Sequence, residues 1–208
     1  MSEQQLIDTI GGRFDVSRET IDCLIQYASD LKKWNRKINL VSPQTIDSLW
    51  SRHFLDSLQL AMFAEPNLTN WVDMGAGGGF PGLVLAAHFA ETATQFTLLE
   101  SDQRKSTFLR TVSRNMGLNV KVIADRIEDI PSIGADMVTA RALAPLDKLL
   151  QYGKRHAVDH AKFIFPKGKN WQSELTIAQE NWQMTVEQFD SLTDVEAKII
   201  KLTNVGKK

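Results

Sequence analysis

The hydrophobic pattern in the first third of the chain predicts two amphipathic helices. After Ser17, apolar residues recur every three or four positions as far as Ile38, which is the spacing of one helix face. Ser17 is a suitable N-cap, and Glu19 places a negative charge in the first turn, where it suits the helix dipole. A second helix is predicted over residues 45–63, where the apolar positions again fall on one face.

From residue 70 onward, short apolar runs alternate with helical segments, a pattern typical of a doubly wound, mostly parallel sheet with right-handed connections. The predicted elements are strands at 70–74, 95–100, 119–124, 135–140 and 161–166, helices at 80–90, 103–116, 145–158 and 170–181, and a helical turn at 126–130. Strands at 183–190 and 196–204 would add an antiparallel C-terminal hairpin. We therefore expect an α/β fold with a helical extension (1–68) and a seven-stranded domain (69–208) in one compact unit.

Composition and charge narrow the class of protein. No apolar run approaches the about 18 residues of a transmembrane helix, and the polar, acidic start is unlike a secretory signal. The single cysteine, Cys23, suits a reducing compartment, so we expect a cytoplasmic protein. A net charge of −1 argues against a uniformly basic nucleic-acid binder but allows local basic patches. Basic side chains cluster at Lys32, Lys33, Arg36 and Lys37, at Arg104, Lys105, Arg110 and Arg114, at Lys154 and Arg155, and at Lys167 and Lys169.

The segment of residues 71–85, with the sequence WVDMGAGGGFPGLVL, carries the clearest chemical signal. A short apolar run bearing Asp73 breaks into a loop with five glycines, and an apolar helix pattern follows. A strand, a tight turn and a helix start in this order let the backbone approach a nucleotide-like ligand closely. Glycine suits such a loop because it adopts positive φ and has no Cβ.

The loop fits two cofactor classes, and neighbouring residues favour one of them. Residues 77–82 match the dinucleotide pattern G-x-G-x-x-G, and Glu100 lies where a carboxylate would bind ribose hydroxyls in either class. Asp73 can bind loop amides or the cationic amino end of S-adenosylmethionine, and Pro81 removes an N–H that a pyrophosphate site would use. We therefore favour S-adenosylmethionine, and a nicotinamide-dependent oxidoreductase is the alternative from another class.

Residues 72–82, VDMGAGGGFPG, resemble motif I of the bacterial small-subunit ribosomal RNA guanine-N7 methyltransferases, also called glucose-inhibited division protein B. The resemblance spans residues 20–170 and includes blocks outside motif I. These blocks are Trp34-Asn35 with Asn39-Leu40, Arg52-His53 with Asp56-Ser57, Leu98 to Lys105, Ser132 to Ala142, and Lys167-Gly168.

The resemblance implies a class I S-adenosylmethionine-dependent methyltransferase, Rossmann-like in fold, with an N-terminal helical extension. It implies methyl transfer to N7 of a guanine in 16S ribosomal RNA, with S-adenosylhomocysteine as the second product. Carried over by motif, the cofactor contacts are Gly75, Phe80, Ile127, Glu128 and Arg141, to which we add Asp73, Gly77 and Glu100 from their own positions. Guanine N7 carries no proton, so the enzyme must orient the reactants and needs no general base.

Candidates for catalysis and substrate binding remain open between functional and structural roles. Arg141 and Lys167 are the catalytic candidates, and the substrate-binding candidates are Asn39, Arg52, His53, Asp56, Arg141 and Lys167. Structural alternatives are an ion pair of Arg141 with Asp136 or Asp147, an i,i+4 pair of Arg52 with Asp56, and helix capping by Asn39.

We expect a monomer that acts on 16S ribosomal RNA or the small ribosomal subunit, without a metal or a membrane. One alternative is a methyltransferase that acts on a protein or a small molecule, since motif I is shared among such enzymes. Another is a ribosome-binding protein without catalytic activity.

Overall fold

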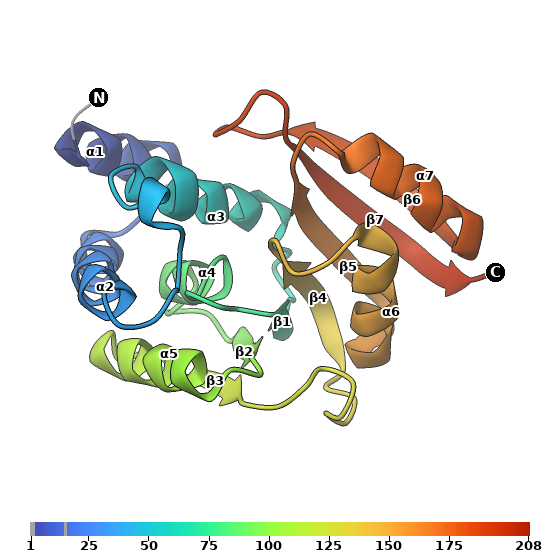
Figure 1. Cartoon of the computed structure of the whole chain (residues 1–208), viewed down its shortest axis with the longest axis horizontal. Helices are drawn as coiled ribbons and strands as arrows, with labels where there is room; N and C mark the ends of the chain where they lie inside the picture. Colours follow the sequence, from blue (N-terminus) through green and yellow to red (C-terminus); the bar gives the residue numbers. More distant parts are fainter. Residues whose placement is uncertain (1–2, 15) are drawn as a thin grey trace.

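A seven-stranded sheet separates two layers of helices (Figure 1). The computed structural model describes residues 3–14 and 16–208. The strand order is β3-β2-β1-β4-β5-β7-β6, with parallel pairing from β3 to β5 and antiparallel pairing of β7 with both β5 and β6. The strands are β1 (Asn70–Met74), β2 (Gln95–Leu99), β3 (Val120–Ile123), β4 (Ala135–Ala140), β5 (Ala157–Lys167), β6 (Trp182–Asp190) and β7 (Lys198–Lys207). The predicted mostly parallel sheet with its closing hairpin is confirmed.

The main boundary error lies between the predicted helix at 145–158 and the strand after it. The helix, α6 (Leu146–His156), ends two residues early, and β5 begins at Ala157. Ala135 pairs with Ala157, but Met137 pairs with Lys162, so the β4–β5 ladder contains a bulge. Because a bulge breaks the alternation of buried and exposed residues, the hydrophobic pattern did not reveal the start of this strand.

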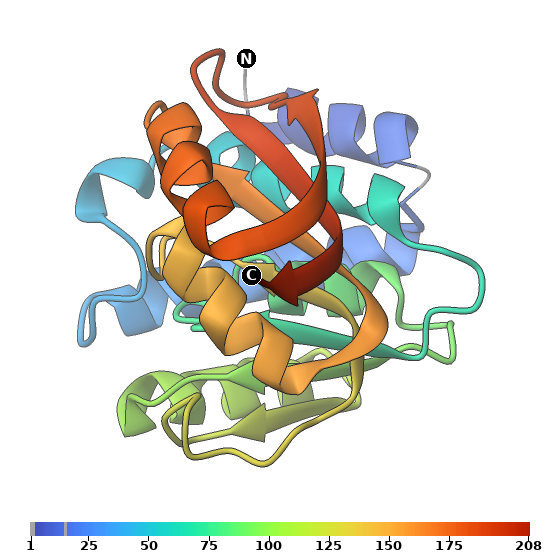
Figure 2. The ribbon, with the colours of Figure 1, turned by 90° about the vertical axis from the view of Figure 1, so that its right-hand side faces the viewer.

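Helices cover the two faces of the sheet in groups that follow the chain. On one face α6 packs beside α7 (Trp171–Asn181), as Figure 2 shows. On the other face lie α4 (Gly82–His88) and α5 (Gln103–Asn115). Side chains of β1 alternate between the faces: Val72 packs with Leu149 of α6, and Trp71 packs with Leu85 of α4.

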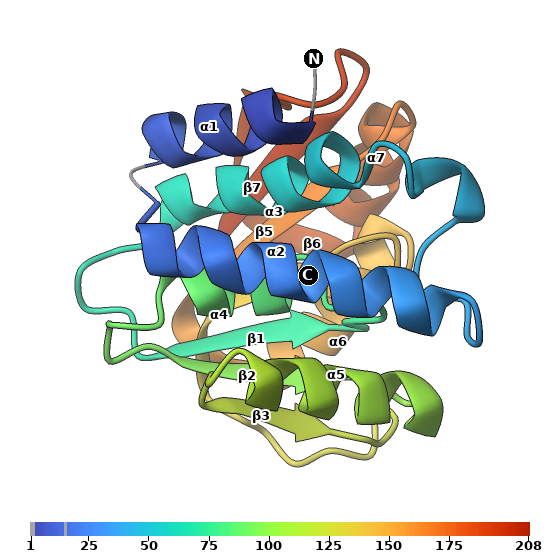
Figure 3. The same ribbon diagram turned by 90° about the vertical axis from the view of Figure 1, so that its left-hand side faces the viewer.

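The N-terminal helices stack on the face that carries α4 and α5 (Figure 3). They are α1 (Glu3–Phe14), α2 (Arg18–Asn35), η1 (Pro43–Thr45), η2 (Trp50–Leu55), α3 (Asp56–Leu58) and η3 (Gln59–Phe63). The predicted N-cap of α2 is confirmed, because the Ser17 hydroxyl accepts a hydrogen bond from Thr20 N at 3.1 Å. Helix α1 was not predicted, since the pair Gly11-Gly12 lowers helix propensity, and the buried side chains of Ile7 and Ile10 anchor it instead.

The second predicted helix, 45–63, is correct in place but not in form. The continuous helical segment begins near Trp50, opens with the π-helical turn η2 and tightens to the 3₁₀ turn η3. A π turn and an α turn differ by one residue in the span of their hydrogen bonds, so the apolar periodicity does not separate them. Such wide turns are frequent at functional sites.

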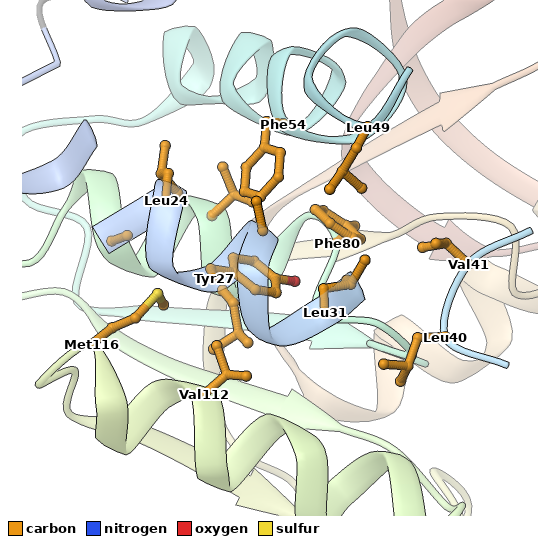
Figure 4. Packing of buried hydrophobic residues seen from close by; sticks show 14 of the residues in the cluster. Leu24, Tyr27, Leu31, Leu40, Val41, Leu49, Phe54, Phe80, Val112 and Met116 are labelled. Carbon is orange, nitrogen blue, oxygen red and sulfur yellow. The ribbon is translucent and has the colours of Figure 1, made fainter. Parts of the chain in front are cut away.

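One hydrophobic core joins the N-terminal extension to the sheet (Figure 4). Phe80, from the loop after β1, stacks on Tyr27 of α2 at 5.3 Å and meets Phe54 of η2 edge-on at 5.4 Å. The predicted boundary between residues 68 and 69 falls just before β1, and this core spans it. Within residues 3–14 and 16–208, no helix is long and apolar enough to span a membrane.

Candidate functional site

A cleft of about 1020 Å³ opens at the carboxyl ends of the parallel strands. In an open α/β sheet this edge is where ligands bind. The strand ends contribute residues 75–78 and 80, 99–101, 125–128, 141–145 and 166–168, while residues of the N-terminal extension and the β6–β7 turn line the other walls. The volume lies at the upper end of the ~300–1000 Å³ found for ligand sites, so the cleft can hold a cofactor together with a second group.

The loop after β1 folds tightly because its glycines leave no side chain in the way. Gly79 has φ +89°, and a Cβ there would overlap the hydroxyl of Tyr27. A Cβ at Gly82 would overlap a methyl group of Leu98 and lie 2.7 Å from an Asp73 carboxylate oxygen. Alanine at either position would therefore force the loop or its support to move.

Two carboxylates bind the amide groups of this loop. Asp73 Oδ2 accepts a hydrogen bond from Gly82 N at 3.0 Å, and Glu100 Oε2 accepts one from Gly77 N at 2.8 Å. Pyrophosphate binding at a helix start depends on such amides being available and on positive local charge. Here the amides are taken by groups that ionise to negative charge. Because both amides are occupied, the arrangement argues against a dinucleotide pyrophosphate at this loop.

Asp73 is buried beneath the loop and does not line the cleft. Its Oδ1 accepts a hydrogen bond from Thr139 Oγ1 at 2.9 Å, and Thr139 in turn accepts one from Trp71 Nε1. Burial raises the pKa of Asp73 to about 7, against the opposing effect of the hydrogen bonds from Thr139 and Gly82. Of the two predicted roles for Asp73, this placement favours binding of loop amides.

Glu100 lies at the end of β2 and faces the cleft. Its Oε1 accepts a second backbone hydrogen bond, from Asp102 N at 2.9 Å. Each carboxylate oxygen keeps a further lone pair, so both can still accept hydroxyl donors.

The predicted residues Ile127 and Glu128 also line the cleft, in a turn after β3. The turn is tied to α6 by two side chains that sequence reasoning missed. His156 Nε2 lies 3.0 Å from the Ile127 carbonyl, to which it donates, and the Tyr152 hydroxyl donates to Glu128 Oε1 at 3.0 Å. Burial lowers the pKa of His156, which keeps the ring neutral.

Arg141, at the end of β4, is held by the N-terminal extension. Nη1 donates to the Arg52 carbonyl and to Asp56 Oδ2, each at 3.1 Å, and Nη2 donates to His53 Nδ1 at 2.7 Å. The guanidinium lies 5.0 Å from the ring centroid of Phe80.

The ion pairs considered as structural alternatives in this region do not form. Arg141 pairs with Asp56 and with neither Asp136 nor Asp147. Asp136 instead accepts hydrogen bonds from the amides of Thr69 and Asn70, and Asp147 accepts one from Trp182 Nε1. Arg52 does not pair with Asp56 at i,i+4, and instead lies 3.8 Å from Asp194 in the β6–β7 turn.

Lys167, at the end of β5, lines the cleft but is tightly paired. Its ammonium lies 2.6 Å from Glu174 Oε2 of α7 and donates to the Ala144 carbonyl at 3.1 Å. Glu174 Oε2 also accepts a hydrogen bond from Leu146 N at the start of α6. The pair therefore fixes the segment after β4.

Two further residues bear on the predicted site. Asn39 is exposed and is not among the described residues that line the cleft. The carboxamide oxygen of Asn35 instead accepts hydrogen bonds from Leu40 N at 2.8 Å and from Val41 N at 3.0 Å.

The sequence analysis did not identify Tyr27, whose hydroxyl donates a hydrogen bond to the Gly78 carbonyl. This residue lies three positions after Leu24 on the apolar face of α2, so the helical spacing could have identified it.

The part of the chain that the structure describes holds no cluster of three or more His, Cys, Asp or Glu side chains that could bind a metal ion.

The amino-acid sequence matches one family of methyltransferases over most of its length. The family model for "rRNA small subunit methyltransferase G" matches residues 20–203. A protein named "Ribosomal RNA small subunit methyltransferase G" from Ruegeria sp. is 45% identical over 193 residues, 92% of this chain and 94% of the relative. One of the same name from Paramagnetospirillum magneticum is 44% identical over 207 residues, 100% of this chain and 98% of the relative.

Solved structures share the fold at low sequence identity. A SAM-dependent methyltransferase from Aquifex aeolicus has a TM-score of 0.58 at 15% identity, covering 85% of this chain and 97% of that one. An O-methyltransferase from Bacillus cereus in complex with SAH has a TM-score of 0.57 at 14% identity, covering 86% and 90%.

Proposed function

The chain belongs to the rRNA small subunit methyltransferase G family, and from this premise we propose that it transfers the methyl group of S-adenosylmethionine to N7 of a guanine in 16S ribosomal RNA. The observation that carries the cofactor assignment is the use of the Gly77 and Gly82 amides by Glu100 and Asp73. Amides that are already hydrogen-bonded to side chains are not free to bind a pyrophosphate, and Glu100, which faces the cleft, adds a carboxylate that disfavours one.

The lining residues fit S-adenosylmethionine. Glu100 has lone pairs for the ribose hydroxyls, and Ile127 offers an apolar surface for the adenine ring. Gly75, Gly77 and Phe80 border the space next to them, and Glu128 and Arg141 line the same cleft. When bound, the cofactor supplies an electrophilic methyl group on a sulfonium ion.

The chain's task in the reaction is orientation. Guanine N7 presents an in-plane lone pair and no proton, so no side chain has to act as a general base. The cleft has to hold N7 and the methyl donor in line, and this fixed geometry lowers the activation barrier of methyl transfer. The target base must leave its stack to enter the cleft.

Of the two catalytic candidates, Arg141 is the better placed to touch a ligand. Three of its five N–H groups bind the protein, and two remain for the cofactor or the RNA. Lys167 is engaged by Glu174 and the Ala144 carbonyl, so we assign it to positioning the segment after β4.

We also propose that the enzyme acts as a monomer in the cytoplasm, where ribosomal RNA is found. The strand ends, the N-terminal extension and the β6–β7 turn of one chain line the cleft on its different sides.

The test is methyl transfer from tritiated S-adenosylmethionine to 30S subunits and to free 16S RNA, followed by nucleoside analysis and mapping of the label. We expect labelled 7-methylguanosine at one position. The control is Glu100→Ala, which removes the proposed ribose contact and should lose most of the label. A wild-type protein that binds the cofactor but labels neither substrate would contradict the proposal, as would label on another nucleoside.

A further inference from the structure

The groups that accept hydrogen bonds from the guanidinium of Arg141 all come from the N-terminal extension. Both N–H groups of Nη1 and one of Nη2 bind residues of η2 and α3, namely Arg52, His53 and Asp56. The side chains of Arg141 and Asp56 are only 18% and 16% exposed, so water weakens their ion pair less than on the surface. Arg141 thus enters the cleft with its orientation already set.

Asp56 connects Arg141 to the C-terminal hairpin. While Oδ2 binds Arg141, Oδ1 accepts a hydrogen bond from the Thr193 hydroxyl at 2.8 Å and from Gln59 Nε2 at 2.9 Å. Thr193 lies in the turn between β6 and β7, and Leu192 N of that turn donates to Gln59 Oε1 at 2.8 Å. The hairpin turn therefore fixes the carboxylate that fixes Arg141.

His53 has a defined tautomer in this network. Arginine can only donate, so Nδ1 of His53 accepts from Arg141 and the ring proton lies on Nε2. Nε2 then donates to Thr45 Oγ1 at 2.8 Å, and the Thr45 hydroxyl donates to the Ser42 carbonyl at 2.8 Å. The ring lies 4.9 Å from that of Phe80, which fixes its plane. His53 has no proton to give to Arg141 and no nitrogen left for a ligand.

We propose that His53, Asp56 and Thr193 are positioning residues that act on the bound ligand through Arg141. The proposal rests on the proposed function and takes the cofactor, rather than the RNA, as the ligand of Arg141. It differs from the sequence-based hypothesis that His53 and Asp56 contact the RNA. Its physical basis is that a free arginine side chain loses considerable rotamer entropy on binding, and a side chain held in advance has already lost it.

The first measurement is the affinity for S-adenosylhomocysteine, by calorimetry on the full chain. Asp56→Asn should weaken binding about tenfold, since it removes the charge that holds Arg141. Thr193→Val, which is nearly isosteric, should weaken it about threefold. The matched control is Thr203→Val on the same hairpin, since Thr203 does not line the cleft, and it should leave the affinity unchanged.

The decisive measurement repeats these substitutions in an Arg141→Ala background, as a double-mutant cycle. If the residues act through Arg141, Asp56→Asn and Thr193→Val should change the affinity there by less than about twofold. Undiminished losses in the Arg141→Ala background would overturn the proposal, as would an Arg141→Ala variant that binds S-adenosylhomocysteine as well as the wild type. A wild-type protein that binds this ligand without methylating ribosomal RNA would contradict the proposed function, while the cycle would still decide the positioning role.

Rescue at His53 provides a second readout that does not depend on Asp56. In His53→Asn the carboxamide oxygen can replace Nδ1 as the acceptor for Arg141, whereas His53→Ala leaves that donor unpaired. We expect His53→Ala to weaken binding about tenfold and His53→Asn to restore most of the loss, with thermal unfolding used to verify that both variants fold. Equal losses in the two variants would contradict a role in holding Arg141.

Discussion

At the residue scale, the least ordinary group is the buried carboxyl of Asp73. It supports the glycine loop through Gly82 N and is itself supported by the Thr139 hydroxyl. Burial raises its pKa to about 7, whereas burial and the charge of Arg141 lower the pKa of His53 to about 3. Asp73 lies beneath the glycine loop, whereas His53 lines the cleft. Their titrations change the free energy of unfolding in opposite directions.

The pH dependence of stability should reveal both groups. Between about pH 4 and 7, Asp73 binds more protons in the folded than in the unfolded chain, so its contribution to the free energy of unfolding falls as the pH rises. Between about pH 3 and 6.5, His53 binds fewer protons in the folded chain, so its contribution to the free energy of unfolding rises with pH. Asp73→Asn removes the first effect. The free energy of unfolding of this variant, relative to wild type, should rise with pH from 4.5 to 7 by up to ~1.4 kcal/mol per pH unit. Urea unfolding at several pH values tests this, and parallel curves for the two proteins would contradict it.

At the element scale, α6 depends on another helix for the hydrogen-bond acceptor that caps its N-terminus. Pro145 at its N-cap position makes no side-chain cap hydrogen bond, and Glu174 of α7 supplies the acceptor for Leu146 N. The same carboxylate pairs with Lys167, whose side chain is 10% exposed. Glu174 of α7 thus caps α6 and balances the charge of Lys167 at the end of β5. These two contacts hold the cleft wall formed by residues 141–145 in place.

Removing this carboxylate should cost stability in two separable parts. Glu174→Ala leaves Leu146 N uncapped and Lys167 without its counter-charge, so we expect the free energy of unfolding to fall by about 2–4 kcal/mol. Glu174→Gln keeps an acceptor for the cap and should cost less. Adding Lys167→Met to Glu174→Ala should recover part of the loss because it removes the unpaired charge. Urea unfolding measures all three, and a Glu174→Ala variant as stable as wild type would exclude the role of this pair.

At the scale of the whole molecule, the two chain regions outside the parallel sheet meet at the cleft. The N-terminal extension contributes Arg52, His53 and Asp56, and the β6–β7 turn contributes Thr193 and Asp194. The C-terminal end of α2 and the start of α5 lie at the edge where the parallel strands end (Figure 3). Exposed basic side chains at these two places could bind RNA phosphates beside the cleft, although the net charge is only −1.

RNA affinity should therefore depend on salt through a few local contacts. The logarithm of the binding constant for 16S RNA should fall linearly with the logarithm of the salt concentration. The double variant Arg36→Glu with Lys37→Glu should lower the magnitude of this slope by about 1–2, because each phosphate contact contributes ~0.7. Both residues are exposed at the end of α2 and do not line the cleft, so affinity for S-adenosylhomocysteine should be unchanged. Filter binding over a range of salt concentrations measures the slope. An unchanged slope would place the phosphate contacts elsewhere.

Much of the fold was predictable because local patterns determine it. The period of apolar residues gave the strands of the sheet, and the Ser17 cap gave the start of α2. Prediction failed where tertiary contacts outweigh local preference. Helix α1 forms across Gly11-Gly12 because Ile7 and Ile10 are buried, and β5 begins early because of a bulge in its pairing with β4.

The sequence by itself determined the cofactor loop, because the glycines and Asp73 act within one short segment where spacing fixes geometry. It also brought Arg141 and Glu100 to the correct edge, since the ends of parallel strands share one side of a sheet. Only the tertiary structure decided which partners these side chains take. Arg141 pairs with Asp56, 85 residues earlier in the chain, and Asp56 binds Thr193, 137 residues later. No local pattern encodes such contacts, because they depend on how the extension and the hairpin pack across the sheet.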